Sequence, residues 1–137
     1  MHPLILRHQA VTSTITLFAD RPLEYGRHDC ARMVAHCLRA QGVRVPLASG
    51  GSYSSAVGAA RALRRLNCGT LSDAIDRLGL PRIAPATALP GDPLALPAPD
   101  GAVALFIAVG NGRAFGYFDG KFQIGQPHLF DAAWRSI

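Results

Sequence analysis

Hydrophobic positions in the first half of the chain recur at helical spacing. Behind Cys30 the apolar residues occupy the i+3, i+4, i+7 and i+8 positions, which predicts an amphipathic helix from about Asp29 to Ala40. Gly42 follows as the expected C-terminal cap. Similar spacing predicts further helices over residues 3–19, 54–66 and 70–78. In the first of these, the β-branched residues 14–16 also fit a strand, so that alternative stays open.

The last third of the chain changes to the pattern of β-strands. Residues 102–109 are an uninterrupted apolar run, typical of a strand covered on both faces. The pairs Asn111-Gly112 and Asp119-Gly120 are strong hairpin signals, so they predict two further strands, over residues 113–118 and 121–125. A short helical tail is expected over residues 129–135.

This order of elements defines the expected fold class. Helices come first and an antiparallel meander follows, with no repeat or linker between them, which indicates one α+β domain over residues 1–137. Nearly half of the 137 residues are hydrophobic (49%) and only 17% are charged, as expected for a chain with a packed core.

Charge and targeting signals narrow the function only slightly. The net charge of +5 comes from thirteen arginines and one lysine, and Arg61, Arg64 and Arg65 share one predicted helix face. Such a trio is more often a solvated face than a binding patch, so a nucleic-acid partner is not expected. No secretory signal or membrane span is evident, which predicts synthesis in the cytoplasm. Three cysteines without a disulfide pattern suit a reducing compartment.

Phosphate and metal chemistry lack the motifs that they need. No glycine-rich phosphate loop precedes a helix, and the cysteines and histidines show no paired short spacing typical of zinc ligands. No cofactor is therefore expected.

Cys30 is the one residue that suggests covalent chemistry. Asp29 is placed to cap the helix that Cys30 begins, and a helix N-terminus can lower the pKa of a thiol. The same position suits a small buried hydrophobic residue, since free cysteine is among the most buried residue types. A nucleophilic thiol also needs an imidazole base. His28, His36 and His128 are candidates, and none stands out by position.

A family resemblance sharpens these alternatives. The stretch Gly26-Arg27-His28-Asp29-Cys30 at a helix start, Gly91-Asp92, and a strand ending in Val109-Gly110-Asn111-Gly112 together resemble the NlpC-like branch of papain-fold cysteine peptidases. The chain is most similar to small relatives encoded in phage and prophage tail gene clusters. Those relatives share the region of Tyr53 and Gly58-Ala59 and a terminal Ala133-Trp134-Arg135, so that the similarity extends from about residue 18 to 135.

The resemblance implies a papain-like fold and a set of site residues. Cys30 falls on the nucleophile and Asp29 on the acidic residue before it, with His28 as the nearest imidazole. The family's base histidine would fall on Ala104, and no polar partner is obvious among residues 114–117. The resemblance therefore implies a catalytically degenerate tail-tip or hub protein, located in the virion and bound to other tail proteins. The alternative is an active cysteine peptidase or amidase that cleaves peptidoglycan stem peptides through Cys30, with His28 or His128 as the base.

Overall fold

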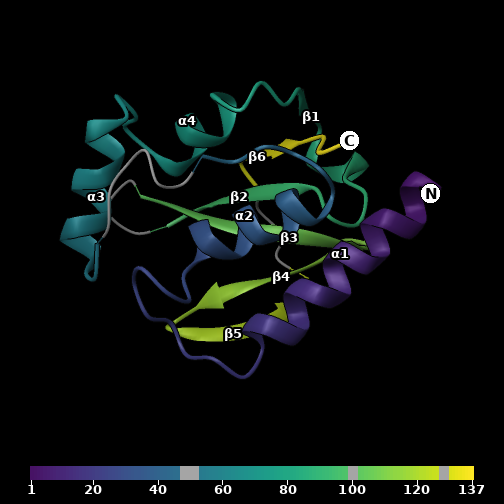
Figure 1. Cartoon of the computed structure of the whole chain (residues 1–137), viewed down its shortest axis with the longest axis horizontal. Coiled ribbons are helices and arrows are strands. Elements are labelled where there is room, and N and C mark those ends of the chain that lie inside the picture. Colours follow the sequence, from purple (N-terminus) through teal and green to yellow (C-terminus); the bar gives the residue numbers. More distant parts are fainter. Residues whose placement is uncertain (47–52, 99–101, 127–129) are drawn as a thin grey trace.

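Four helices and a six-stranded antiparallel sheet form the part of the chain that the computed structural model describes, residues 1–46, 53–98, 102–126 and 130–137 (Figure 1). The helices are α1 (Pro3–Phe18), α2 (Cys30–Ala40), α3 (Ala56–Arg65) and α4 (Leu71–Asp76), with a 3₁₀ turn η2 (Pro85–Thr87). The strands are β1 (Arg82–Ile83), β2 (Pro93–Pro97), β3 (Val103–Gly110), β4 (Arg113–Phe118), β5 (Lys121–Gly125) and β6 (Ala132–Trp134). This arrangement confirms the α+β class. Among the described residues no helix is long and apolar enough to cross a membrane.

Side-chain caps set the starts of α2, α3 and α4, and the sequence predicted the cap of α2 by Asp29. Asp29 caps α2, and Thr70 and Asp73 form a reciprocal capping box at α4. Ser55 caps α3, which therefore begins at Ala56. Ala62 is the buried residue of α3, while Ala56 and Ala60 are exposed.

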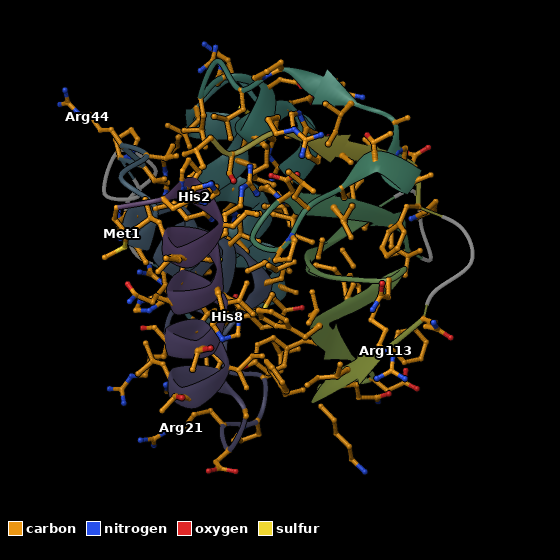
Figure 2. The ribbon with its side chains drawn as sticks, turned by 90° about the vertical axis from the view of Figure 1, so that its right-hand side faces the viewer. Met1, His2, His8, Arg21, Arg44 and Arg113 are labelled. Atoms are coloured by element: carbon orange, nitrogen blue, oxygen red, sulfur yellow. The ribbon has the colours of Figure 1, made fainter. Side chains whose placement is uncertain are left out.

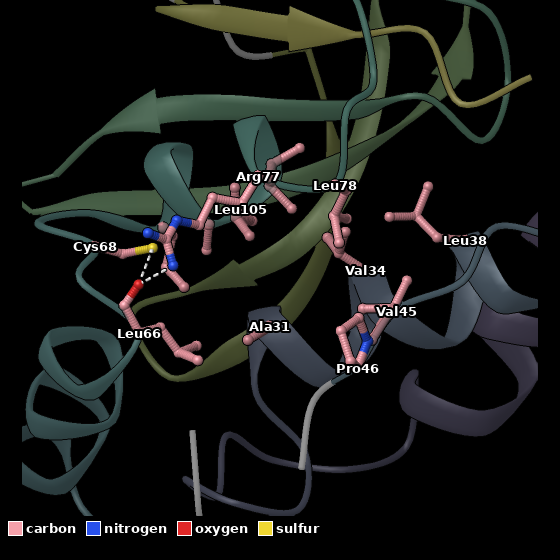
Figure 3. Close-up of a pocket in the computed structure, with 14 residues that line it drawn as sticks. Ala31, Val34, Leu38, Val45, Pro46, Leu66, Cys68, Arg77, Leu78 and Leu105 are labelled. Carbon is pink, nitrogen blue, oxygen red and sulfur yellow. Dashed lines mark hydrogen bonds between the residues drawn. The ribbon is translucent and has the colours of Figure 1, made fainter. Parts of the chain in front are cut away.

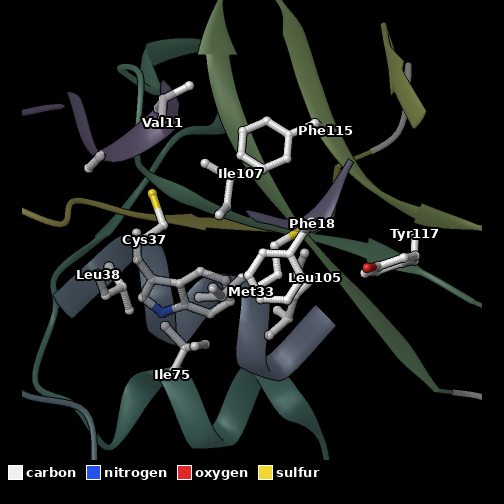
Figure 4. Close-up of a cluster of buried hydrophobic side chains, with 14 of the residues drawn as sticks. Val11, Phe18, Met33, Cys37, Leu38, Ile75, Leu105, Ile107, Phe115 and Tyr117 are labelled. Atoms are coloured by element: carbon white, nitrogen blue, oxygen red, sulfur yellow. The ribbon is translucent and has the colours of Figure 1, made fainter. Parts of the chain in front are cut away.

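The strands on either side of the two predicted hairpin turns form as expected, and they divide the core into two layers. Both residues of each turn pair have positive φ, the backbone that a two-residue hairpin requires. On β3, Leu105 and Ile107 face the helices, while Phe106 and Ala108 point to the opposite face of the sheet. The helix-facing cluster takes side chains from α1, α2, α4, β2, β3, β4 and β6 (Figure 4).

The strands β1, β2 and β6 of the sheet were not predicted. The sheet order is β1-β6-β2-β3-β4-β5, so β2 pairs with β3 on one side and with β6 on the other. The predicted helix over residues 129–135 is wrong in its described part, where Ala132–Trp134 is β6. Its backbone pairs with Leu94 and Ala95 of β2, which would otherwise have an unpaired edge.

A hydrogen-bonded aspartate at the end of α4 gives the first prediction, a loss of stability in acid. The Asp76 carboxylate accepts hydrogen bonds from Arg82 (2.7 and 2.9 Å) and from the indole N–H of the buried Trp134 (2.8 Å), and these lower its pKa from 3.8 to about 2. A pKa that is lower in the folded than in the unfolded state stabilises the fold above about pH 4, and this stability is lost as the pH falls through about 2. Because the side chain is 40% exposed, we expect about 1 kcal/mol or less.

Urea unfolding followed by the fluorescence of Trp134, the single tryptophan, measures this contribution. Asp76→Asn is expected to remove the part of the acid dependence that comes from this carboxyl. A variant whose stability falls with pH as steeply as that of the parent would contradict the assignment.

Candidate functional site around Cys30

Cys30 is the first residue of α2, and its partly buried side chain borders a small apolar cavity. The cavity has a volume of about 140 Å³ and lies between the start of α2 and the inner face of α3. Tyr25, Asp29 and Tyr53 supply its polar lining, and Ala59, Ala62 and Leu63 supply the wall formed by α3. The thiol therefore has room beside it, but the room is mostly hydrophobic.

Asp29 is a structural acceptor at the helix start. Its Oδ1 accepts the backbone N–H of Arg32 (2.9 Å), and its Oδ2 accepts both the backbone N–H of Gly26 (2.9 Å) and the hydroxyl of Tyr53 (2.8 Å). The residue is only 3% exposed. These bonds join the turn before α2, the helix itself and the segment before α3.

Glycines fix the close packing of the same region. Gly26 has φ +87°, and a Cβ built there would lie 1.9 Å from the carbonyl oxygen of Tyr53. A Cβ at Gly58 would lie 3.1 Å from the Cβ of Tyr53. Gly26, Asp29, Tyr53 and Gly58, which we call the Asp29 cluster, therefore depend on each other for their packing. The family resemblance includes all four residues, but the sequence alone does not show that they are in contact.

The environment of the Cys30 thiol opposes ionisation. The pKa of the thiol is raised from 9.0 to about 11, with burial as the largest cause and the negative charge of Asp29 as a smaller one. The backbone N–H groups of Leu105, Ala31 and Cys30 itself act in the opposite direction and do not compensate. Of the two alternatives that the sequence left open, the raised pKa favours the small buried residue, because desolvation outweighs the backbone hydrogen bonds at the helix start.

The described histidines make their contacts elsewhere. The His28 ring packs against Phe18 (centroids 5.8 Å apart) and its Nδ1 lies 4.0 Å from Glu24. His36 shares a hydrogen bond with Ser13 (3.0 Å), and burial lowers its pKa.

The remaining two described histidines belong to α1. His2 caps this helix, and Figure 2 shows His8 along it. Among the described residues, the groups with the largest influence on the pKa of the Cys30 thiol include no imidazole. The candidate His128 lies outside the described residues.

Position 104 is not where a base for Cys30 would stand. The Ala104 side chain packs against the sheet face turned away from α2, together with Leu94 and Phe106. Side chains alternate along a strand, so the neighbouring Leu105 points toward α2, and its backbone N–H acts on the thiol. The expectation that Ala104 occupies the place of the imidazole is therefore corrected, since a histidine there would face the other layer.

Tyr117 is a polar group of this region whose role the sequence did not reveal. It lies on β4 with its side chain in the helix-facing cluster, only 7% exposed (Figure 4). Its hydroxyl has no hydrogen-bond partner among the described residues, and its pKa is raised by burial and by the charge of Asp29. Side chains alternate along a strand, so Tyr117 points to the same face of β4 as the apolar Phe115 two residues earlier. This alternation could have predicted its place in the helix-facing cluster.

Asp92, the second acidic residue of the resemblance, is the centre of a separate buried cluster. Its Oδ1 accepts hydrogen bonds from Arg7 (2.8 Å) and from Ser136, and its Oδ2 accepts from Arg135 (2.9 Å) and the backbone of Leu89. Asp92 is 0% exposed and Arg7 is 2% exposed. We call these five residues the Asp92 cluster. They tie α1 to the start of β2 and to the C-terminal segment.

A family model described as a domain of unknown function, DUF6950, matches residues 6–136. The chain belongs to this family. No curated protein and no solved structure matches it. The matched residues include Cys30, the whole Asp29 cluster and the whole Asp92 cluster, so both clusters lie within the DUF6950 domain.

No group of three or more histidine, cysteine, aspartate or glutamate side chains that could hold a metal ion occurs among the described residues. The three thiols are free, and Cys37 and Cys68 are buried.

Proposed function

We propose that this DUF6950 domain is a non-hydrolytic, papain-like domain of the NlpC type that serves as a structural part of a phage or prophage tail tip or hub. The observation that carries the proposal is the state of Cys30. Its thiol has a pKa of about 11 and stands among apolar side chains, whereas a cysteine nucleophile requires a thiolate or a base to form one.

The two buried clusters give further support. The residues that resemble a peptidase motif, Asp29 and Gly91-Asp92, are engaged in hydrogen bonds and packing within the fold. Such residues would persist in a lineage that lost catalysis, because the fold depends on them. The tail location and the neighbouring tail proteins rest on the resemblance of the sequence to tail-cluster relatives.

The proposal predicts a slow reaction of Cys30 with iodoacetamide. With a pKa of about 11, roughly one thiol in ten thousand is ionised at pH 7, against a few per cent for an ordinary cysteine. We expect alkylation at least about a hundredfold slower than that of a free model thiol, and a rate that rises until about pH 11. Peptide mass spectrometry at each time point assigns the modified cysteine, and the unfolded protein in guanidinium, where all three cysteines react, is the control.

The competing function is a cysteine amidase that cleaves peptidoglycan. It predicts selective alkylation of Cys30 at neutral pH, and release of stem peptides that Cys30→Ala abolishes. His128→Ala tests the histidine that lies outside the described residues: if this change slows alkylation of Cys30, His128 is the base and the non-hydrolytic proposal fails. For the tail role, phage carrying Cys30→Ser should remain infectious, and loss of infectivity on this change would count against a purely structural part.

A further inference from the structure

A second and larger cavity lies beyond Cys30, between α2, α4 and β3 (Figure 3). Its volume is about 310 Å³, at the lower end of the range for small-molecule pockets of about 300–1,000 Å³. Val34, Leu38, Ile75, Leu78 and Leu105 are among the side chains that form its body. Four of its lining residues also line the cavity at Cys30, so the two cavities are neighbours: Ala31, Leu66, Leu71 and Ala74.

One end of this cavity is cationic. Arg77 is the charged side chain of the described lining, and one of its guanidinium nitrogens, Nη1, donates to the carbonyl oxygen of Leu66. The Cys68 thiol donates to the same carbonyl (3.6 Å), at the same end (Figure 3). No carboxylate among the described residues forms an ion pair with Arg77, so its other N–H groups can serve a ligand.

An apolar cavity with one arginine at its end matches a molecule with an alkyl chain and a single negative charge. The chain would replace empty apolar surface, and the carboxylate would pair with a guanidinium that can donate two parallel hydrogen bonds. We propose that the cavity binds a medium-chain fatty carboxylate, with the alkyl chain between α2, α4 and β3 and the carboxylate at Arg77. This proposal does not depend on whether Cys30 is catalytic, since no atom of Cys30 takes part in it.

Calorimetric titration of the full chain with decanoate, below its micelle concentration, tests the proposal. Burial of each methylene contributes about 0.8 kcal/mol, so affinity should rise roughly fourfold for each methylene from hexanoate to decanoate. Decan-1-ol has the same chain without the charge and should bind several-fold more weakly, and decylammonium should bind weakest because its charge repels Arg77. Equal affinity for the three head groups would overturn the role of Arg77, and no saturable binding of decanoate would overturn the site.

Two variants locate the binding. Arg77→Gln should weaken decanoate about fivefold, the equivalent of about 1 kcal/mol for an exposed ion pair, and leave decan-1-ol unchanged. Arg64→Gln, an exposed arginine on α3 outside this lining, is the matched control. Ala74→Leu fills the cavity wall and should weaken both ligands more than tenfold, with circular dichroism to confirm that the variant is folded. If folded Ala74→Leu binds decanoate like the parent, the ligand lies elsewhere and the proposal is wrong.

Discussion

Replacing Asp92 by alanine is expected to lower the free energy of unfolding by about 3–5 kcal/mol, the range for breaking a buried ion pair by removing one partner. Asp92 is fully buried, and its two oxygens accept hydrogen bonds from Arg7, Arg135, Ser136 and the backbone of Leu89. Without the carboxylate, the guanidinium of Arg7 stays buried and keeps only backbone carbonyl acceptors. An uncompensated buried charge is the main cost.

Urea unfolding measures the change, and Asp131→Ala is the matched control. Asp131 is an exposed aspartate next to β6, and its substitution should alter stability by less than about 0.5 kcal/mol. A second variant, Arg7→Met, removes the other buried charge and should also destabilise the fold, by leaving Asp92 with fewer donors. If Asp92→Ala cost no more than Asp131→Ala, the Asp92 cluster would not hold the C-terminal segment against α1.

Gly91, the residue before Asp92, is needed for the packing beside the same cluster. Gly91 has φ +92°, and a Cβ there would lie 2.8 Å from the side-chain amide of Gln41. That amide donates to the carbonyls of Gly91 and Cys37, while the amide oxygen accepts from Ser136. The Gly-Asp pair is therefore explained by packing between α2 and the C-terminal segment, without any contact with Cys30.

Local signals explain why most elements could be predicted from the sequence. The caps Asp29 and Thr70 act on backbone groups within three residues, and the turn pairs at 111–112 and 119–120 fix φ at their own positions. Each of these signals acts on backbone groups only a few residues away in the sequence. They gave the helix starts and the hairpins without knowledge of the rest of the chain.

Elements that depend on distant partners could not be predicted in the same way. The strand β2 is bounded by Pro93 and Pro97 in a segment rich in proline and alanine, and β6 contains three residues whose pattern also fits a helix. Both become strands because they pair with each other and because β3 supplies the second edge of β2. The pKa of Cys30 is likewise set by burial under α3 and β3, which the helix start alone does not reveal.

The second large effect is expected for Asp29→Asn, which should destabilise the fold by about 2 kcal/mol and yet make Cys30 more reactive. Asparagine is also a good N-cap, so the bond to the N–H of Arg32 can persist. The amide NH₂ of the asparagine then faces the N–H of Gly26, which loses its acceptor in a half-buried position, at a cost of about 1–3 kcal/mol. Removing the charge of Asp29 also removes one cause of the raised pKa of the thiol.

The two readouts separate a structural Asp29 from a catalytic one. If Asp29 serves the fold, Asp29→Asn lowers the unfolding free energy while the rate of Cys30 alkylation at pH 8 increases, since a lower pKa gives more thiolate. If Asp29 assists a nucleophilic Cys30, the same change should slow alkylation. Tyr53→Phe is the control, because it removes one hydrogen bond to Asp29, at a cost of about 1 kcal/mol, but keeps the charge. Faster alkylation in Tyr53→Phe as well would show that loosened packing, and not the charge of Asp29, controls the thiol.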